Sequence, residues 1–377
     1  MSDLNNHITD RRKQTRSAVF RYLHKASSPR SKLDIARDLE LSMPTVYQNV
    51  SELLDAGFIE YCGMGESSGG RPPMYLQTVN DVCCAIGMNI KAETLDIASA
   101  NLSGRETAFR SIPYSMAVES PEFAAFAVSE LERFIDEKKL PRERLLGVGI
   151  TLGGLIQAYT NNVIIAPTLA AKNMNLDLLV NSIPYPAILE NDANSGGFAE
   201  WYSSGRQGKM AYLFLAEGIG GTMFVNDDEF TGTNGRSGEF GHMCVERGGK
   251  LCNCGKHGCL EAYCSSRRFR KELGMSTGEF FTALADGEPE ALAIWEDYSS
   301  HLVTGIHNIR MVLDCDVVLG GHQSKYLEPY LPELKRKLAE GDPFDSSADY
   351  IRIAKDPEYS SILGVALYFI RDFISSI

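Results

Sequence analysis

Three closely spaced cysteines constrain the fold of this chain more than any other feature of its sequence. They form the pattern Cys252-x-Cys254-x4-Cys259, with glycines between the thiols. Thiols at this spacing favour a tetrahedral zinc site, which needs a fourth ligand from elsewhere in the chain. His242 is the nearest candidate upstream, and His257 within the loop is the alternative. A site with four protein ligands has no open position, so we expect zinc to hold the loop in shape without taking part in chemistry.

The remaining cysteines do not indicate a disulfide framework. Residues 1–12 lack the apolar segment of a signal peptide, and the chain has no long apolar run. We therefore expect a cytoplasmic protein without a membrane span, in which thiols stay reduced. A zinc site then explains the three clustered thiols better than free cysteines in a loop. The other six are interpreted as ordinary buried thiols: Cys62, Cys83, Cys84, Cys244, Cys264 and Cys315.

Charge is unevenly distributed along the chain. The net charge is −12, yet the first 80 residues hold 10 Lys/Arg against 9 Asp/Glu. Within residues 11–37, nine side chains are basic and only Asp34 is acidic. Basic charge concentrated in this way is typical of a surface that faces nucleic-acid phosphates, although a solvated helix face has the same composition.

The basic segment falls within a predicted helix-turn-helix. Apolar residues at helical spacing predict helices over residues 10–26, 32–39 and 44–56, the second of which buries Leu33. Ser42 is placed to cap the third helix. Two helices joined by a tight turn, with the second entering the major groove, form the helix-turn-helix plan of DNA-binding proteins.

Predicted DNA contacts lie in the third helix and in a wing that follows it. Amide side chains at the start of the helix can pair with an adenine edge. Strands over residues 58–61 and 74–76 predict the wing, whose glycine-rich loop ends in Arg71 and is expected to reach a minor groove. The alternative is a protein-interaction module, but helices, charge and loop together favour double-stranded DNA. The other expected contacts avoid the core face of the helix: Ser42, Thr45, Gln48 and Asn49.

Several ordered motifs run through the rest of the chain. Between Glu239 and Glu261, the run Glu-Phe-Gly-His is followed by Cys-x-Cys-Gly-x2-Gly-Cys-Leu-Glu. Further motifs are Gly153-Gly154, Glu190-Asn191-Asp192, Gly218-Ile219-Gly220-Gly221-Thr222 and Gly320-Gly321. Together they resemble the ROK family of repressors, open reading frames and sugar kinases, over nearly the whole chain. The winged helix with its Gly-Gly-Arg-Pro loop is similar to that of the family's repressor branch.

The resemblance implies an α/β protein in which an N-terminal winged helix-turn-helix precedes a two-lobed actin/hexokinase-like (ribonuclease H-like) domain with the zinc loop. We expect the winged domain in residues 1–80 and the first lobe in residues 81–195, rejoined by a helix at 361–377. The second lobe is expected in residues 196–360, with a long helix over residues 289–313. A sugar would bind in the cleft between the lobes.

The resemblance also implies which residues bind the sugar. They are Asn173, Asn191, Asp192, Glu239, His242 and Glu261. Carboxylates and amides suit this role because sugar hydroxyls both donate and accept hydrogen bonds. His242 can bind zinc through one ring nitrogen and a hydroxyl through the other, which would couple the metal site to the pocket. Asn173 has an alternative role as a residue that caps a turn.

Kinase activity is not expected, although Asp192 holds the position of the family's catalytic base. Family kinases carry Asp-x-Gly-Gly-Thr-Lys after the first strand, where this chain has Asn89-Ile90-Lys91-Ala92-Glu93-Thr94. Glycines let the backbone approach a phosphate, whereas Lys91 and Ala92 obstruct that approach and Glu93 repels the phosphate. Asp192 is then a hydroxyl acceptor. A kinase that also binds DNA is the alternative.

The sequence thus predicts a sugar-responsive repressor of carbohydrate-utilisation genes. Its expected partners are operator DNA, a sugar or sugar phosphate, and further copies of the chain. A homodimer or a dimer of dimers is expected because a lone helix-turn-helix reads too few base pairs. The remaining alternative is a repressor that responds to a protein partner and binds no sugar. Whether the ligand releases or strengthens DNA binding is left open.

Overall fold

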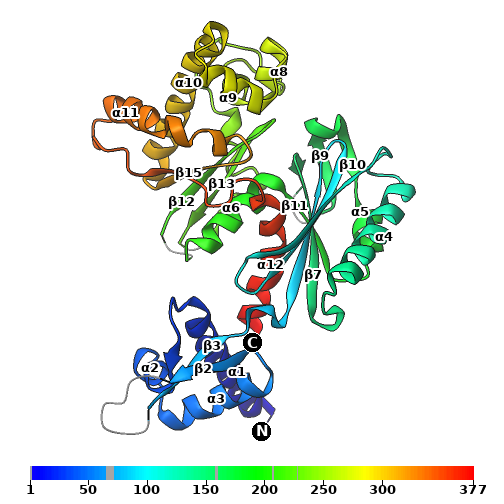
Figure 1. Ribbon diagram of the computed structural model, residues 1–377, viewed down its shortest axis with the longest axis vertical. Helices are drawn as coiled ribbons and strands as arrows, with labels where there is room; N and C mark the ends of the chain where they lie inside the picture. Colours follow the sequence, from blue (N-terminus) through cyan, green and yellow to red (C-terminus); the bar gives the residue numbers. More distant parts are fainter. Residues whose placement is uncertain (1, 65–71, 158–159, 206–207, 227) are drawn as a thin grey trace.

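The N-terminal domain has the predicted winged helix-turn-helix (Figure 1). The computed structural model describes residues 2–64, 72–157, 160–205, 208–226 and 228–377. The wing loop, including Arg71, therefore lies outside the described residues. The domain combines three helices with a small antiparallel sheet in the order β1-β3-β2. Its elements are α1 (Ser2–Lys25), β1 (Arg30–Ser31), α2 (Lys32–Asp38), α3 (Met43–Asp55), β2 (Ile59–Met64) and β3 (Met74–Thr78).

Local sequence signals set the ends of the two short helices. The Ser31 hydroxyl and the Asp34 carboxylate form a reciprocal cap at the start of α2. Ser42 caps α3, as predicted, by accepting a hydrogen bond from the backbone N–H of Thr45. Gly57 follows α3 with a φ of +74°, a conformation that costs glycine nothing. The prediction for Leu33 was wrong: its side chain is 65% exposed because it points outward from the first turn of α2.

The first lobe is built on a five-stranded sheet in the order β11-β7-β4-β5-β6. Strands β11, β7 and β4 run parallel, and β5 and β6 complete the sheet as antiparallel neighbours. Helices α4 and α5 pack on one face through a shared apolar core, and a small sheet of β8, β9 and β10 extends the lobe. The elements are β4 (Cys84–Ile90), β5 (Thr94–Asn101), β6 (Glu106–Pro113), α4 (Pro121–Lys138), β7 (Leu145–Leu152), β8 (Leu155–Ile156), β9 (Asn162–Ala166), β10 (Ala171–Asn175), α5 (Asp177–Ser182) and β11 (Ala187–Asn191).

The second lobe repeats this plan with a five-stranded sheet in the order β14-β13-β12-β15-β16. Its helices share one apolar core with the sheet, and the long predicted helix over residues 289–313 is present as α10. The strands are β12 (Met210–Leu215), β13 (Ile219–Val225), β14 (Asp228–Glu229), β15 (Asp316–Gly320) and β16 (Ile351–Ile353). The helices are α7 (Glu261–Cys264), α8 (Arg267–Leu273), α9 (Thr277–Ala285), α10 (Pro289–Leu313) and α11 (Leu331–Gly341).

Two helices pack together where the lobes meet. The last helix, α12 (Ser360–Ser376), returns to the sheet of the first lobe and lies against α6 (Asp192–Ser203) (Figure 1). Their close approach depends on Gly364, where an added Cβ would come within 1.7 Å of the Ser195 carbonyl oxygen. The helices therefore contact each other backbone to backbone, and α12 is fixed firmly between the lobes.

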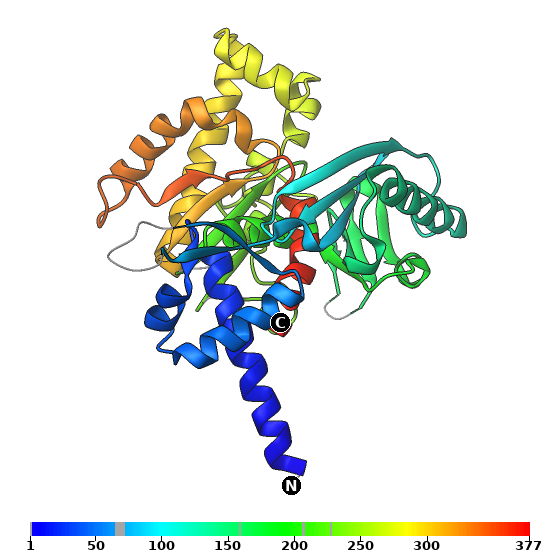
Figure 2. The same ribbon diagram turned by 60° about the horizontal axis from the view of Figure 1, so that its bottom comes forward.

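The far end of α12 carries the N-terminal domain. The Ser17 hydroxyl and the Arg16 guanidinium donate hydrogen bonds to the carbonyl oxygens of Ile374 and Ile377, at 3.1 and 2.7 Å. Apolar residues of the winged domain, α6 and α12 form one continuous core. Figure 2 shows α1 running past the end of α12 and away from the body of the protein. The winged domain is thus packed against the lobes through α12.

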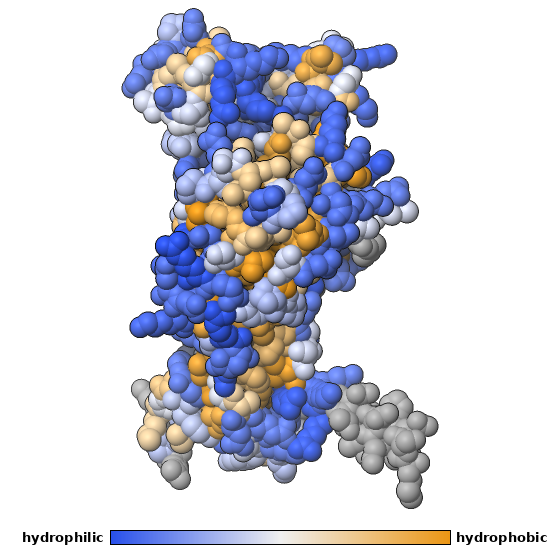
Figure 3. Space-filling model, turned by 90° about the vertical axis from the view of Figure 1, so that its right-hand side faces the viewer, coloured by the Kyte–Doolittle hydropathy of each residue, from blue (hydrophilic) through white to orange (hydrophobic). Residues whose placement is uncertain are grey.

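Two further properties concern the apolar character of the helices and of the surface. None of the helices in the described ranges is long and apolar enough to cross a membrane. Figure 3 views the face formed by the first lobe and shows apolar residues gathered over its middle, with hydrophilic residues along its sides. Ile164 and Leu178 are exposed large apolar side chains of this lobe.

Candidate sugar cleft, metal cluster and DNA-binding face

A cleft of about 710 Å³ lies between the two lobes. Its walls are the turn between β4 and β5, the carboxyl end of β11, the turn between β12 and β13, and the start of α7. The volume is in the range of pockets that hold small metabolites. The carboxyl end of a parallel strand is also where α/β folds place their ligands.

Asn191 and Asp192 occupy the junction between β11 and α6. The Asn191 side chain caps α6 by accepting the N–H groups of Ala193 and Asn194, and its amide donates to the Gly154 carbonyl oxygen at 2.6 Å. Its hydrogen bonds join the end of β11 to the turn after β7, and both segments line the cleft. Asp192 has its carboxyl group in the cleft, where the exclusion of water raises its pKa to about 6.

Glu239, His242 and Glu261 line the opposite side of the cleft. The Glu239 carboxylate lies 3.9 Å from Nε2 of His242. Glu261 is buried, and its carboxylate accepts hydrogen bonds from the backbone N–H of Ile219 and from the Arg267 guanidinium, at 3.1 and 3.0 Å. These groups, with Asp192, present several hydrogen-bonding oxygens to one cavity.

Asn173 does not join the other predicted residues. It lies on β10, exposed, with a φ of +52°, and is absent from the described residues that line the cleft. The expectation that Asn173 lies in the pocket is therefore not met in this arrangement of the lobes. A short polar side chain tolerates the left-handed backbone that its position in β10 imposes.

Two cleft residues were missed from the sequence. Glu190 precedes Asn191 and accepts hydrogen bonds from the N–H of Asn191 and the amide of Asn194, while burial raises the pKa of its carboxyl group. Arg267 pairs with Glu261 and also donates to the Glu217 carbonyl oxygen. Glu190 lay within a motif already singled out, whereas no local signal marked Arg267.

The turn between β4 and β5 forms part of the rim of the cleft. Lys91 closes this turn by donating its N–H to the Thr94 carbonyl oxygen at 2.9 Å. Its ammonium group lies 2.6 Å from the buried Asp96 carboxylate. The turn is thus a hairpin closed by its own backbone, and the charge of Lys91 is balanced within it.

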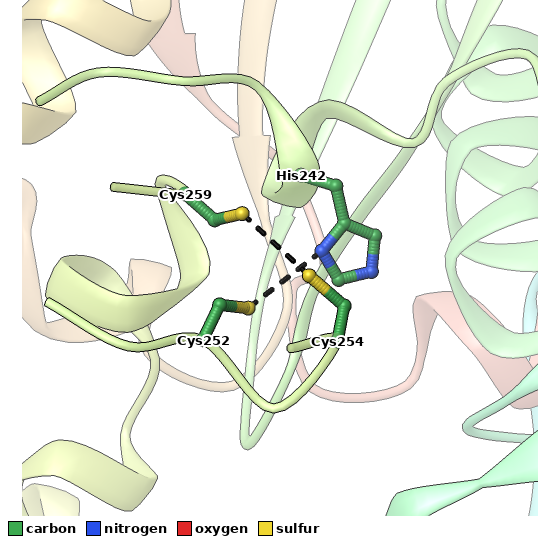
Figure 4. Close-up of side chains that lie close together, drawn as sticks. All are labelled: His242, Cys252, Cys254 and Cys259. Atoms are coloured by element: carbon green, nitrogen blue, oxygen red, sulfur yellow. Dashed lines mark hydrogen bonds between the residues drawn. The ribbon is translucent and has the colours of Figure 1, made fainter. Parts of the chain in front are cut away.

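Four side chains of the second lobe converge on one point (Figure 4). One donor atom from each of His242, Cys252, Cys254 and Cys259 lies within 4.8 Å of all the others. Nδ1 of His242 is 3.8 Å from the Cys252 sulfur, and the sulfurs of Cys254 and Cys259 are 3.7 Å apart. His257 instead has its Nδ1 2.9 Å from the Gly249 carbonyl oxygen. The structure therefore brings His242, and not His257, close to the three thiols.

The start of α3 places two of the predicted DNA contacts on the surface and one in the core. Thr45 is half-buried and Gln48 is exposed, whereas Asn49 is only 3% exposed. The Asn49 amide donates to the Thr45 carbonyl oxygen at 2.8 Å inside the domain. Asn49 was thus wrongly expected to avoid the core face. The Ser42 hydroxyl is exposed but also lies 2.7 Å from the Thr45 hydroxyl within the cap.

An aromatic cluster beside α3 was missed from the sequence. Tyr47 of α3 is 55% exposed, and the Lys32 ammonium lies 4.4 Å from the centre of its ring. The same ammonium donates to the Tyr61 hydroxyl of the wing at 2.9 Å. Three elements of the winged domain thus bring a cation and two tyrosines together on an exposed surface, an arrangement that suits contacts with phosphates and sugars of DNA.

Comparisons with known proteins agree with this architecture. Residues 116–371 match the ROK family, and residues 14–62 match a helix-turn-helix domain. A protein of Caldicellulosiruptor sp. (strain Rt8B.4), named as a candidate xylose repressor, is 24% identical over 92% of both chains. The transcriptional dual regulator NagC of Escherichia coli (strain K12) is 26% identical over 69% of this chain and 65% of its own. The crystal structure of a ROK transcriptional regulator, a homologue of E. coli MLC, superposes with a TM-score of 0.76 at 22% identity and 97% coverage of both chains.

Proposed function

This chain belongs to the ROK family, and from that membership we propose that it is a sugar-responsive repressor of carbohydrate-utilisation genes. A helix-turn-helix domain and a cleft lined by hydrogen-bonding groups are present in one chain. The observation that carries the proposal is the position of α12, which contacts the cleft at one end and the winged domain at the other. Binding in the cleft and binding to DNA can therefore influence each other through a single helix.

Asp192, Glu239, His242 and Glu261 are proposed to bind the hydroxyls of a sugar or sugar phosphate. Their oxygens and the Nε2 of His242 face one cavity, and a sugar can satisfy them in pairs. Asn191 is proposed to position the cleft, because its side chain is engaged by α6 and Gly154. The names of relatives, which include a candidate xylose repressor and an N-acetylglucosamine repressor of Escherichia coli O157:H7, suggest xylose and N-acetylglucosamine as the first sugars to test.

The cluster of His242, Cys252, Cys254 and Cys259 is proposed to bind zinc. Zinc–sulfur bonds of about 2.3 Å in a tetrahedron separate the sulfurs by about 3.8 Å, close to the distances in the cluster. Zinc would join the turn that carries His242 to the cysteine loop and so fix the ring that faces Glu239. The role is structural, since four protein ligands leave no position for a substrate.

Signal transfer is proposed to run along α12. Near its start, the Ser361 hydroxyl donates to the Asp192 carbonyl oxygen at 2.8 Å. About two turns further on, the Tyr368 hydroxyl donates to the Glu229 carboxylate of the second lobe at 2.9 Å. Its last turn contacts Ser17 and Arg16 of α1. Closure of the lobes on a sugar moves residues that hold α12, and the winged domain moves with the helix.

DNA recognition is proposed to use the exposed surface of α3 and the neighbouring cluster. Gln48 and Thr45 are placed to read base edges, with Ser42, Lys32 and Tyr47 beside them. Arg71 in the wing loop remains a proposed minor-groove contact. We also propose a homodimer or a dimer of dimers acting in the cytoplasm, since two-fold symmetry matches inverted-repeat operators. The apolar face of the first lobe is a candidate contact between copies (Figure 3).

Kinase activity is the second candidate, and Asp192 is the observation that favours it. A carboxyl group with a pKa near 6 suits a general base. Against this stands the turn between β4 and β5, where Lys91, Ala92 and Glu93 replace the residues that approach a nucleotide phosphate. We propose that the chain is not a kinase. ATP-dependent phosphorylation of xylose or N-acetylglucosamine that disappears in Asp192→Asn would contradict this.

The proposed function is tested by selecting bound duplexes from a random pool with the full chain. We expect the selected sequences to contain an inverted repeat. The affinity for that duplex is then measured in a gel-shift assay with and without each sugar of a panel that includes xylose and N-acetylglucosamine. A cognate sugar should change it at least about fivefold, in the range of ordinary coupling energies. Absence of any selected sequence would refute DNA recognition, and absence of any sugar effect would favour control by a protein partner.

A further inference from the structure

A second cavity, of about 560 Å³, lies between the winged domain and the lobes. One wall is formed by the end of α1, the turn after it, and β3. The opposite wall contains Ser103, Tyr202, Ser203 and Ile374. No described residue lines both this cavity and the cleft between the lobes. Its volume is again that of a metabolite pocket.

Two of the side chains that line this junction cavity, Arg21 and Lys25, are positively charged. Arg21, His24 and Lys25 line it, whereas no Asp or Glu is found among the described residues of its walls. The Lys355 ammonium donates to the Ser203 carbonyl oxygen at 3.0 Å and adds a further positive charge beside it. In a chain with a net charge of −12, a cavity of this composition attracts anions.

The cations of the cavity are available to a ligand. Within the described ranges, neither Arg21 nor Lys25 forms an ion pair, and Arg21 uses Nε alone for a weak contact with the Ser17 carbonyl oxygen at 3.4 Å. Hydroxyls of Ser27, Ser28, Thr78 and Ser103 also line the walls. Arginine, lysine and hydroxyl donors around one cavity are the groups that bind phosphate and carboxylate oxygens.

These cations lie in a cavity that no described residue of α3 lines. The cavity is closed on one side by residues of the lobes. His24 faces the lobes too, with Nε2 3.2 Å from the Tyr202 hydroxyl.

We propose that the junction cavity binds a small organic anion, either a phosphorylated or a carboxylated metabolite, as a second effector site. The anion is held by Arg21 and Lys25 of the winged domain and by hydroxyls on both walls. Because the two walls belong to different domains, the anion binds the docked arrangement of the winged domain and stabilises it. The site is independent of the sugar cleft, and its existence does not depend on the sugar response.

The proposal is tested by calorimetry on the full chain with inorganic phosphate and citrate, two anions that are not sugars, as probes, and with glycerol as the uncharged control. We expect at least one anion to bind with a dissociation constant in the millimolar range or below. The double variant Arg21→Gln/Lys25→Gln should weaken that binding at least about tenfold, as expected for the loss of two charge-assisted contacts. Both side chains are exposed, so the variant should fold normally, which its melting temperature will verify.

Two control variants locate the site. Lys13→Gln removes an exposed charge from the same helix but not from the cavity, and should leave anion binding unchanged. Arg270→Gln removes a cation that lines the sugar cleft, and should also leave it unchanged. The proposal is overturned if no anion binds, if the double variant binds as well as the natural chain, or if either control loses as much affinity as the double variant. Failure of the sugar response leaves these outcomes unaffected.

Discussion

The two ends of α12 lie in opposite electrostatic surroundings. Near Ser361 the helix borders a cleft with Asp192, Glu190, Glu239 and Glu261, where burial raises the pKa of the first two carboxyl groups. Near Ile374 it borders a cavity with three basic side chains and no acidic one among its described lining residues. The acidic end suits uncharged hydroxyls and the basic end suits anions. The single helix α12 thus borders a cleft suited to sugars and a cavity suited to anions, and it also contacts the DNA-binding domain.

The largest effect is expected from breaking the contact that holds α12 in place. In Gly364→Val, the new side chain would collide with the Ser195 backbone, so α6 and α12 must move apart. We expect a loss of about 3 kcal/mol or more in the free energy of unfolding, measured by urea denaturation. Gly341→Ala is the matched control, since nothing lies within 4 Å of its added Cβ. Equal stability of the two variants would show that α12 is held loosely.

Loss of the cluster of His242 and the three cysteines should weaken sugar binding in the cleft and leave the junction cavity unchanged. Cys254→Ser removes one of four converging ligands, and we expect the protein to lose one equivalent of zinc in metal analysis. Sugar affinity should fall at least about tenfold because the His242 ring is no longer fixed. Cys62→Ser is the control and should keep both. Cys62 and Cys244 were expected to be buried, but both are exposed, Cys62 on β2. Zinc retained in Cys254→Ser would place the metal elsewhere.

Asp192→Asn tests whether the cleft binds sugar through its carboxylates. We expect sugar affinity in calorimetry to drop about 10- to 100-fold, as for the loss of a hydrogen bond to a charged group, with operator affinity unchanged in the absence of sugar. Asn173→Ala should leave sugar affinity as it is, because Asn173 lies outside the cleft. A loss of sugar affinity in Asn173→Ala would mean that lobe closure brings Asn173 into the pocket.

The pH dependence of stability should report on Glu229, which α12 contacts through Tyr368. Burial, with a smaller contribution from the charge of Glu190, raises the pKa of Glu229 from 4.5 to about 7. Between these pH values the folded chain binds more protons than the unfolded chain, so the free energy of unfolding falls as the pH rises. The expected contribution is about 1–3 kcal/mol. Glu229→Gln should flatten this slope in urea denaturation from pH 5 to pH 7.5. An unchanged slope would show that Glu229 is not the source of the pH dependence.

The smallest effect, a few-fold change in the affinity for DNA, is expected from single substitutions on the DNA-binding surface. Lys32→Gln should weaken binding to all duplexes by a similar, few-fold factor and reduce the salt dependence of affinity by about one phosphate contact. Gln48→Ala should instead reduce the preference for the selected operator over other duplexes. Gel-shift titrations at several salt concentrations separate the two outcomes. Loss of sequence preference in Lys32→Gln would assign Lys32 to base recognition.

Sequence patterns predicted local features well where one short segment contains the whole signal. The caps of α3, the bounds of α10 and the three clustered thiols all depend on residues a few positions apart. The error at Asn49 also had a local signal. Val46, Asn49, Val50 and Leu53 follow the spacing of one helix face, and all four are buried. A polar residue at such a position satisfies its amide within the helix, as Asn49 does with Thr45.

The sequence by itself determined the order of domains, the winged helix and five of the residues that line the cleft, because those depend on local spacing and on motifs. Only the tertiary structure decided that His242 completes the metal cluster, that Asn173 lies outside the cleft, and that α12 connects the cleft to the winged domain. The junction cavity also depends on the tertiary structure, because it forms where His24 contacts Tyr202 and Ser17 contacts Ile374. Contacts between residues so distant in sequence are selected by the packing of whole elements, and no local pattern encodes them.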